Sequence, residues 1–447
     1  MRTYFAILVF ALAAGAQQPT PASLAQQELP GLVATYKQIH EAPELSHQEA
    51  KTSALVAGQL RAMGYTVTDH VGKYAGHPEW TGYGVVAILK NGPGPTLLVR
   101  SELDALPVTE VTPLPWASRV IAKDDSGQTV GVMHACGHDI HMTVLLGTAA
   151  ALMRLKSEWH GTLELIGQPA EETINGAKAM LDDGLYTRFP KPDLAIALHD
   201  NAELAAGKLG YTPGFAMASA TSVKVTLHGV SAHGSLPEDS KDPVVAAAEL
   251  VLALQAIVSR ETSPFDQAVV TVGSIQAGTK NNIIPASATL LLTVRTYKEE
   301  VRQRILASIR RMADGIALAD GLPKDQPPQI ETYEYTPALY NDPALAQRLS
   351  AVLTRTFGAA NVEKLPPIMA SEDFGYLGLQ ATSDPRKIPV FFYSLGAVDP
   401  AKIAASQRTG IPLPSLHSNL FEPLPAPTIE TGVTAMTTLA LKLLGEH

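Results

Sequence analysis

The residues of this chain that could do chemistry gather first around its only cysteine. Cys136 lies two positions before His138 in the run MHACGHDIH, residues 133–141. A thiolate and an imidazole at this spacing suit a borderline cation such as zinc, and a single cysteine cannot form a disulfide within the chain. The motif therefore indicates a metal site. The alternative is a buried, inert cysteine beside structural histidines, because free cysteine is among the most buried residue types.

Other metal-competent side chains follow the strands of an expected α/β sheet. They are Glu102 and Asp104 after the strand at residues 96–99, Glu171 and Glu172 after 163–166, His199 after 194–198, and His417 after the strand around Phe391. Ligands of α/β sheets collect at the carboxyl ends of the strands, so we expect these side chains to converge with Cys136 and His138. Taken singly, an acidic residue after a strand often caps the next helix instead.

The adjacent acids Glu171 and Glu172 suggest a division of roles. Neighbouring side chains of extended backbone point to opposite sides, so one carboxylate can bind a metal while the other faces an attacking water. That is the arrangement of a ligand beside a general base. The alternative is a solvated acidic first turn of the helix that follows.

Alternating strand and helix patterns describe the scaffold that must position these residues. Short runs rich in Val, Ile and Leu alternate with segments of helical length, which predicts an α/β domain with a mostly parallel sheet and helices on both faces. Helices are expected at residues 29–40, 49–63, 143–155, 177–181, 343–357 and 428–444. We assign this catalytic domain to residues 28–212 and 329–447.

A smaller domain is inserted into the first. From Ser222 the run SVKVTLHG alternates apolar and polar residues, as a strand with one solvent-facing side does. Two helices and two more strands complete a β-α-β-β-α unit, at residues 243–258, 299–316, 268–275 and 288–296. We predict a ferredoxin-like α/β domain at residues 213–328, after which a strand near Thr332 returns the chain to the first domain.

Composition and the first residues narrow the function classes. Of the 447 residues, 46% are hydrophobic and 17% are charged, which argues against a disordered chain. The net charge of -9 and the absence of a long basic run argue against a nucleic-acid partner. Arg2, the apolar residues 5–14 and the AGA run at 14–16 match a secretory signal peptide. We expect cleavage after Ala16, a linker at residues 17–27, a periplasmic or secreted product and no stable membrane insertion; the alternative is an uncleaved anchor.

Seven runs of the sequence resemble a known enzyme family. In order they are HEAPELSHQE (40–49), RSELDALP (100–107), MHACGHDIH (133–141), QPAEE (168–172), GVSAHGSLPE (229–238), NNIIPASA (281–288) and SEDF (371–374). They resemble the metal-dependent amidohydrolases of the aminoacylase and carboxypeptidase superfamily, in the branch of hippurate, N-acyl-amino-acid and auxin-conjugate hydrolases. The most specific element is HACGHD followed by PAEE. The resemblance implies a two-metal peptidase-like domain with an inserted dimerisation or lid domain.

The resemblance also implies a set of site residues. The implied ligands of two divalent cations are Cys136, His138, Glu172, His199 and His417. Such a pair of cations lowers the pKa of a bridging water and polarises an amide carbonyl. Glu171 is implied as the catalytic base, and Asp104 as the residue that orients a ligand histidine. We expect zinc, with manganese, cobalt and nickel as alternatives.

Residues of the insert are implied to complete the site. His233 corresponds to a family histidine that reaches the active site of the partner subunit and stabilises the tetrahedral oxyanion, so we expect a homodimer. Asn282 and Arg295 resemble residues that hold the carboxylate of the substrate. The alternatives are an ordinary surface-loop histidine for His233 and a strand-surface residue for Arg295.

Several neighbouring residues are expected to support the site. They are His40, His47, His134 and His141, together with Glu372 and Asp373 at the floor of the site. Glu102 departs from the family run, which usually has an aspartate there, and a longer carboxylate can shift metal coordination or narrow the acyl pocket. The segment at residues 403–415, before His417, is longer than usual.

We therefore expect a metal-dependent amidohydrolase that cleaves the amide bond of an N-acyl amino acid or a similar carboxylate-bearing amide. One alternative is a dipeptidase or carboxypeptidase. Another, of a different class, is a non-catalytic metal-containing binding protein. Glu171 argues against the latter, because a structural metal site needs ligands but no free base.

Overall fold

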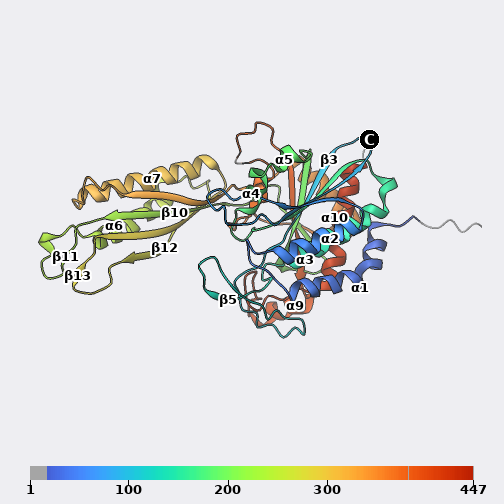
Figure 1. Cartoon of the computed structure of the whole chain (residues 1–447), viewed down its shortest axis with the longest axis horizontal. Coiled ribbons are helices and arrows are strands. Elements are labelled where there is room, and N and C mark those ends of the chain that lie inside the picture. The colour runs from blue at the N-terminus through green and yellow to red at the C-terminus, as the bar shows by residue number, and fades with distance from the viewer. Residues whose placement is uncertain (1–17, 381, 446–447) are drawn as a thin grey trace, which may run out of the picture.

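Two β-sheets organise the chain, one in each domain. The computed structural model describes residues 18–380 and 382–445, so the expected signal peptide at residues 1–16 lies outside the described residues. The larger domain surrounds an eight-stranded sheet, and the insert is built on a four-stranded sheet. The insert projects from one side of the larger domain as an elongated arm (Figure 1).

The eight-stranded sheet is parallel in its centre and antiparallel toward its edges. Its order is β1-β2-β6-β3-β7-β18-β8-β17. The strands are β1 Thr66–Val71, β2 Gly84–Asn91, β3 Thr96–Glu102, β6 Gly161–Gln168, β7 Leu194–Ala205, β8 Leu209–Tyr211, β17 Val362–Lys364 and β18 Val390–Val398. Strands β6, β3, β7 and β18 are parallel neighbours. Their carboxyl ends therefore meet at one edge of the sheet, as predicted.

Helices cover both faces of this sheet, because the central strands bury side chains on both sides. One face, with Leu97 and Val99, packs against α1 Pro21–His40, α2 Ala50–Ala62, α3 His138–Arg154, α8 Pro343–Phe357 and α10 Pro425–Leu444. The other face, with Leu98, packs against α4 Gly176–Asp182 and α5 Leu185–Arg188. The predicted α/β architecture is confirmed.

The first helix begins earlier than expected. Helix α1 starts at Pro21, inside the segment at residues 17–27 that was predicted to be a linker. Thr20 caps the helix: its side chain accepts a hydrogen bond from the Ser23 backbone, and the Ser23 side chain donates to the Thr20 carbonyl oxygen. A capping residue followed by proline at the first position is a strong helix start, so the linker prediction was wrong from residue 21 onward.

The insert has a ferredoxin-like topology. Its elements are β10 Ser219–His228, α6 Pro243–Ala256, β12 Ala268–Ala277, β14 Ser287–Thr296, α7 Glu299–Ala319 and β15 Gln329–Thr336. The sheet order is β12-β14-β10-β15, and both helices pack on the same face. This β-α-β-β-α-β arrangement confirms the predicted fold class of the insert.

The insert ends one strand later than predicted. The strand near Thr332 was assigned to the larger domain, but it is β15, which pairs with β10, with Thr332 opposite Val223. Without β15 the strand β10 would be an unpaired edge, and unpaired edges are a liability that proteins cover. The boundary predicted at residue 328 is therefore wrong, and the insert extends to Thr336.

One helix of the described residues meets the length and composition of a membrane span. It covers Pro243–Glu261, with a mean hydropathy of 1.5, and consists of α6 and the helical turn after it. Its inner face, with Ala246, Leu250 and Leu254, packs in the core of the insert. Its outer face leaves Val245 and Leu252 exposed, at 52% and 74% of their surface.

A buried carboxyl group in β6 makes the stability of the larger domain depend on pH. Glu164 is fully buried, and neither of its carboxyl oxygens has a hydrogen-bond partner. Burial raises the pKa of Glu164 from 4.5 to about 8. Because the unfolded chain releases this proton at a lower pH than the folded chain does, the free energy of unfolding falls as pH rises between these two values.

We predict that Glu164→Gln removes this fall in the free energy of unfolding with rising pH. The difference in unfolding free energy between variant and wild type should be small at pH 5 and should grow toward pH 8, by up to about 1.4 kcal/mol per pH unit. Denaturant unfolding at several pH values measures it, with the exposed Glu300→Gln as the matched control. Parallel stability curves for wild type and Glu164→Gln would contradict the prediction.

Candidate active site

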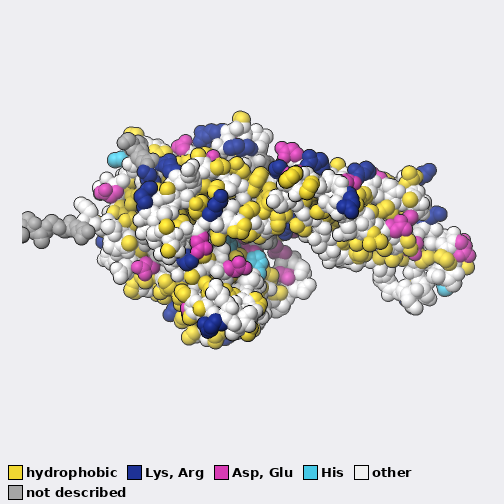
Figure 2. Space-filling view, turned by 180° about the vertical axis from the view of Figure 1, so that it is seen from behind, with side chains coloured by type: hydrophobic (Ala, Val, Ile, Leu, Met, Phe, Trp, Pro, Cys, Tyr) yellow, Lys and Arg dark blue, Asp and Glu magenta, His cyan; other side chains and the backbone are white. Residues whose placement is uncertain are grey.

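The candidate site occupies a cavity between the carboxyl edge of the large sheet and the base of the insert. The cavity has a volume of about 920 Å³ and is lined by Cys136, Glu171 and His199 of the larger domain and by Arg295 of the insert. Figure 2 shows histidine and acidic side chains in a hollow where the insert joins the larger domain. The expected position, at the ends of the parallel strands, is thus where these side chains lie.

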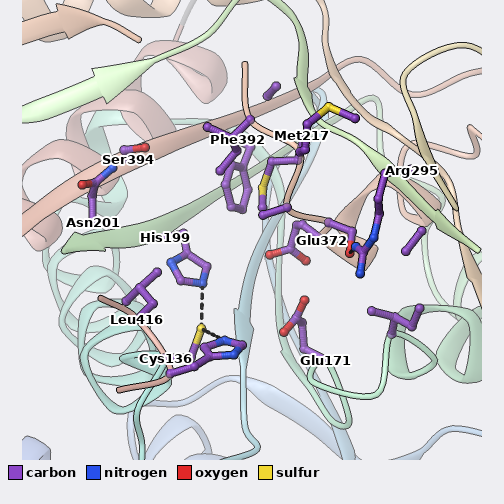
Figure 3. Close-up of a pocket in the computed structure, with 18 of the residues that line it drawn as sticks. Cys136, Glu171, His199, Asn201, Met217, Arg295, Glu372, Phe392, Ser394 and Leu416 are labelled. Atoms are coloured by element: carbon purple, nitrogen blue, oxygen red, sulfur yellow. Dashed lines mark hydrogen bonds between the residues drawn. The ribbon is translucent and has the colours of Figure 1, made fainter. Parts of the chain in front are cut away.

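The five implied ligands lie next to one another. Cys136 Sγ is 3.4 Å from His199 Nε2, a contact drawn in Figure 3, and 3.2 Å from His417 Nε2. His417 Nε2 is 3.5 Å from Glu172 Oε2. His138 Nε2 is 3.9 Å from Glu172 Oε1. Four segments far apart in the sequence therefore contribute to one cluster.

The donor atoms of this cluster fit two cations. The ligand atoms of Cys136, His138 and His199 lie within 4.8 Å of one another, and so do those of Cys136, Glu172 and His417. These two groups share Cys136, and together they contain the five residues that would hold two cations. His138 Nε2 and Glu172 Oε1 are buried and have no hydrogen-bond partner. Buried polar atoms without partners are rare, and a bound cation would supply the missing interaction.

A glycine places Cys136 and His138 on the same side of the cluster. Gly137 has a φ of +73° and precedes the first residue of α3, which is His138. A Cβ atom at Gly137 would lie 2.0 Å from Asp200 Oδ2. Only glycine fits this close approach, so the C-G-H spacing has a geometric cause.

The backbone orients two of the ligand histidines. His138 donates from Nδ1 to the Asp104 carbonyl oxygen at 2.8 Å, which leaves Nε2 for a metal. His199 donates from Nδ1 to the Asp200 carbonyl oxygen, also at 2.8 Å. Metal-bound imidazoles are commonly fixed in this way through their other nitrogen. Asp104 thus contacts the implied ligand His138, chiefly through its backbone, with its Oδ1 3.4 Å from His138 Nδ1.

Glu171 faces the same space as the ligands. Its Oε2 lies 3.8 Å from His138 Nε2, and its carboxylate and that of Glu372 point toward the cavity in Figure 3. Burial, followed by the charges of Glu372 and Glu172, raises the pKa of Glu171 well above its usual value. A carboxyl group with a raised pKa beside a cavity is a candidate acid-base catalyst.

Two of the implied ligands, Glu172 and Cys136, are also shifted toward their protonated forms. Burial raises the pKa of Glu172 to about 7, although the charge of His138 opposes this. Burial and the charges of Glu172 and Glu171 raise the pKa of the Cys136 thiol well above 9.0. Cation binding must therefore displace protons from the site.

The three implied residues of the insert lie in two places. Arg295 lines the cavity and donates from Nη1 to Ser371 Oγ at 2.5 Å. His233 and Asn282 are exposed at the far tip of the insert, where β11 Ala232–His233 pairs with β13 Ile283–Ile284 (Figure 1). The Gly234 backbone donates to the Asn282 carbonyl oxygen there. Of these three residues, only Arg295 lines the cavity of its own chain.

Asp200 is a site residue that the sequence reasoning missed. This buried carboxylate has its Oδ1 3.2 Å from His199 Nδ1 and 3.4 Å from His141 Nε2. Its backbone N–H donates to His141 Nε2 at 2.8 Å. The available signal was its position directly after His199, at the carboxyl end of an expected strand.

Glu102 and the supporting histidines occupy the layer behind the ligands. The Glu102 carboxylate accepts from His141 Nδ1 at 2.8 Å and pairs with Arg100. Its extra length thus reaches His141. His40 is buried between Asp139 and Glu110 at 2.6 and 3.2 Å. Burial lowers the pKa of His40, but the two carboxylates outweigh this effect and raise it to about 10.

The remaining expected supports are placed as follows. His134 is buried without a hydrogen-bond partner, and burial lowers its pKa to about 4. His47 stacks on Trp80, with ring centroids 3.7 Å apart. Glu372 and Asp373 are buried and accept hydrogen bonds from Arg100.

Known proteins are similar to this chain in sequence. The model of Peptidase family M20/M25/M40 matches residues 98–416. A hippurate hydrolase of Campylobacter jejuni is 39% identical over 341 residues, which is 76% of this chain and 82% of that protein. An N-acetylcysteine deacetylase of Bacillus subtilis is 33% identical and covers 82% of this chain and 88% of its own length.

Solved structures agree with these sequence relatives. A putative aminohydrolase from methicillin-resistant Staphylococcus aureus superposes with a TM-score of 0.80 and 28% identity, over 96% of this chain and all of that one. A dinuclear metal-binding peptidase of the M20 family from Bacillus subtilis has a TM-score of 0.72 and 27% identity, over 94% of this chain and 99% of that one. The expected superfamily is confirmed. This protein belongs to Peptidase family M20/M25/M40 and is a metal-dependent hydrolase of amide bonds.

Proposed function

We propose that this protein hydrolyses N-acyl amino acids, with Glu171 as the base that activates a water held at the dinuclear site. The observation that carries the proposal is a buried carboxyl group beside the ligand cluster, in a cavity that also contains Arg295. The names of the hippurate hydrolase and the N-acetylcysteine deacetylase fit this substrate class.

Each part of the reaction has a candidate group. When bound, the two cations supply the polarisation of the amide carbonyl and the lowered pKa of the water. Glu171 takes the proton of that water and delivers it to the nitrogen of the leaving amine. The Arg295 guanidinium binds the carboxylate of the amino-acid product, for which its planar geometry is suited.

The apolar part of the cavity is suited to the acyl group. Met217, Phe392 and Leu416 line the cavity around His199 (Figure 3). Apolar walls with a few placed polar groups are typical of small-molecule sites. We infer that the acyl group lies against these side chains while the carboxylate faces Arg295.

We propose zinc as the metal in both positions. The thiolate of Cys136 and the imidazoles of His138, His199 and His417 are ligands that zinc favours. Manganese, cobalt and nickel are the alternatives, because they accept the same donor types. Elemental analysis of protein purified without added metal distinguishes them.

The substrate class is tested by hydrolysis of hippurate, N-acetylmethionine and a set of dipeptides. We expect turnover of the N-acyl amino acids, its loss on treatment with a chelator, and its return when zinc is added. Release of the free amino acid measures the rate. Faster cleavage of dipeptides would favour the dipeptidase alternative, and no turnover with two metals bound would favour a binding protein.

The role of Glu171 is tested by Glu171→Gln. The amide keeps the size of the side chain but cannot accept a proton, so we expect kcat to fall by at least about 100-fold. The metal content should stay at the wild-type value, because Glu171 is not among the proposed ligands. Wild-type kcat in this variant would show that another group is the base.

We also propose that the protein is a homodimer in which His233 of the partner subunit completes each site. Two features support this arrangement. Strand β12 is the edge of the insert sheet, and the outer face of α6 exposes apolar side chains such as Leu252. Exposed apolar side chains on an extended arm are typical of an interaction surface.

Subunit mixing tests the dimer. Glu171→Gln and His233→Ala should each be inactive alone, but mixed dimers would contain one site with both Glu171 and His233 intact. We expect activity to appear when the two variants are mixed and allowed to exchange subunits. A monomeric protein, or inactive mixed dimers verified by native mass spectrometry, would contradict the proposal.

Export is a further part of the proposed function. The signal-like pattern at residues 1–16 supports a periplasmic or secreted product. Expression in a bacterium with a periplasm should yield a mature chain that begins at Gln17. Recovery of the uncleaved chain from the membrane fraction would favour an anchor instead.

A further inference from the structure

The segment just before α2 contacts the loop that carries the proposed base. This segment, residues 44–49, belongs to the run HEAPELSHQE, to which the mechanism above assigns no role. The loop, residues 169–175, connects β6 to α4 and holds Glu171 and Glu172. The two segments are more than 100 positions apart in the sequence but are joined by a hydrogen bond between Glu49 and Ala170.

The acid-bearing loop has a strained backbone. Ala170 and Ile174 have φ values of +50° and +51°, in the left-handed region that side chains with a Cβ atom adopt at an energetic cost. The turn is closed by hydrogen bonds from the Ile174 backbone to the Glu171 carbonyl oxygen and from the Gly176 backbone to the Ala170 carbonyl oxygen. Strain of this kind persists only where neighbouring groups hold the backbone in place.

Glu49 is the neighbour that holds the start of this loop. The Ala170 backbone N–H donates to Glu49 Oε1 at 2.8 Å, and Glu49 is completely buried. Ala170 immediately precedes Glu171, so this hydrogen bond acts at the residue whose backbone sets the direction of the base. The other oxygen of Glu49 has no hydrogen-bond partner, so the carboxyl group acts on the loop through Oε1 alone.

A second contact from the same segment acts through Asp104 on Glu172, two positions after Ala170. Ser46 donates to Asp104 Oδ2 at 2.6 Å, and the same oxygen accepts from the Glu172 backbone at 2.9 Å. Two carboxyl groups therefore hold the loop. Glu49, which belongs to the segment, accepts from the Ala170 backbone, and Asp104, which Ser46 of the segment contacts, accepts from the Glu172 backbone.

We propose that Glu49 is a positioning residue, which holds Ala170 in the left-handed conformation and thereby directs Glu171 toward the water. This inference rests on the proposed role of Glu171. Glu49 itself touches neither the cavity nor the cluster, so its removal should affect the chemical step rather than substrate or metal binding.

The test compares two substitutions of Glu49. Glu49→Met keeps the length of the side chain but removes the acceptor, and we expect kcat to fall by about 10- to 100-fold while KM and metal content stay near wild type. Glu49→Gln keeps an acceptor oxygen and should restore most of kcat. If Glu49→Met does not fold, Glu49→Asp makes the same comparison, because its shorter side chain withdraws the acceptor from Ala170.

Glu44→Ala is the matched control for a general effect on stability. Glu44 lies in the same segment and accepts hydrogen bonds from the Lys51 and Thr52 backbone at the start of α2, but it does not contact the loop. We expect this variant to lower the melting temperature without lowering kcat. Equal losses of kcat in Glu44→Ala and Glu49→Met would contradict a specific role of Glu49.

Ala170→Gly in the Glu49→Met background tests the conformational cause. Glycine adopts the left-handed region without the steric cost, so we expect part of the lost kcat to return. No recovery, or a kcat of Glu49→Met within twofold of wild type, would overturn the inference. If Glu171→Gln is inactive while Glu49→Met is fully active, only this inference fails; if Glu171→Gln is fully active, the proposed base fails first.

Discussion

The site depends on the burial of many acidic groups at one edge of a sheet. Buried carboxyl groups there belong to Glu102, Asp104, Glu171, Asp200, Glu372 and Asp373, whereas Arg100 is the only buried lysine or arginine among the described residues. Burying charges of one sign is costly unless opposite charges or protons compensate them. The raised pKa values of Glu171 and Glu172 reflect that cost for the polypeptide alone. Two divalent cations would supply the missing positive charge, so the dinuclear centre balances the charge of this edge as well as providing its chemistry.

Arg100 pairs with three of these acids that are not among the proposed metal ligands. Its guanidinium donates to Glu372 at 2.7 Å and to Asp373 at 3.1 Å, and it also pairs with Glu102. Asp373 accepts further hydrogen bonds from Gln168 and from the Ala177 backbone. Arg100 therefore compensates the charge of these acids. Glu171 and Glu172 form no ion pair with Arg100 in the described part of the chain, and they remain for the proposed catalysis and coordination.

Local sequence patterns predicted the architecture, and the resemblance to a known family implied the ligand set, but both failed where long-range pairing decides. Periodicity located the central strands, and the rule that ligands collect at the carboxyl ends of strands predicted that Cys136, Glu172 and His199 converge, and their positions in the structure agree with this. The strand near Thr332 was misassigned because its partner β10 lies about 100 residues earlier, and nothing local marks that pairing. Asp200 and the contact of Glu102 with His141 were missed for a related reason. An acidic residue after a strand has the same local pattern whether it binds a metal or supports a ligand.

The larger domain holds the proposed ligands and base, and the projecting insert holds residues implied to contact the substrate. Most of the proposed ligands lie beside strands and helices that share one core, and this core limits their movement, whereas His417 lies in the segment between α9 Pro400–Thr409 and α10. His233 and Asn282 lie on a two-stranded hairpin at the tip of the insert, which has its own separate core. Changes in the insert can therefore alter substrate contacts without displacing the cations. Glu49 lies on the rigid side of this division, because it connects the start of α2 to the loop of Glu171, and the geometry of the base is thus set within the larger domain alone.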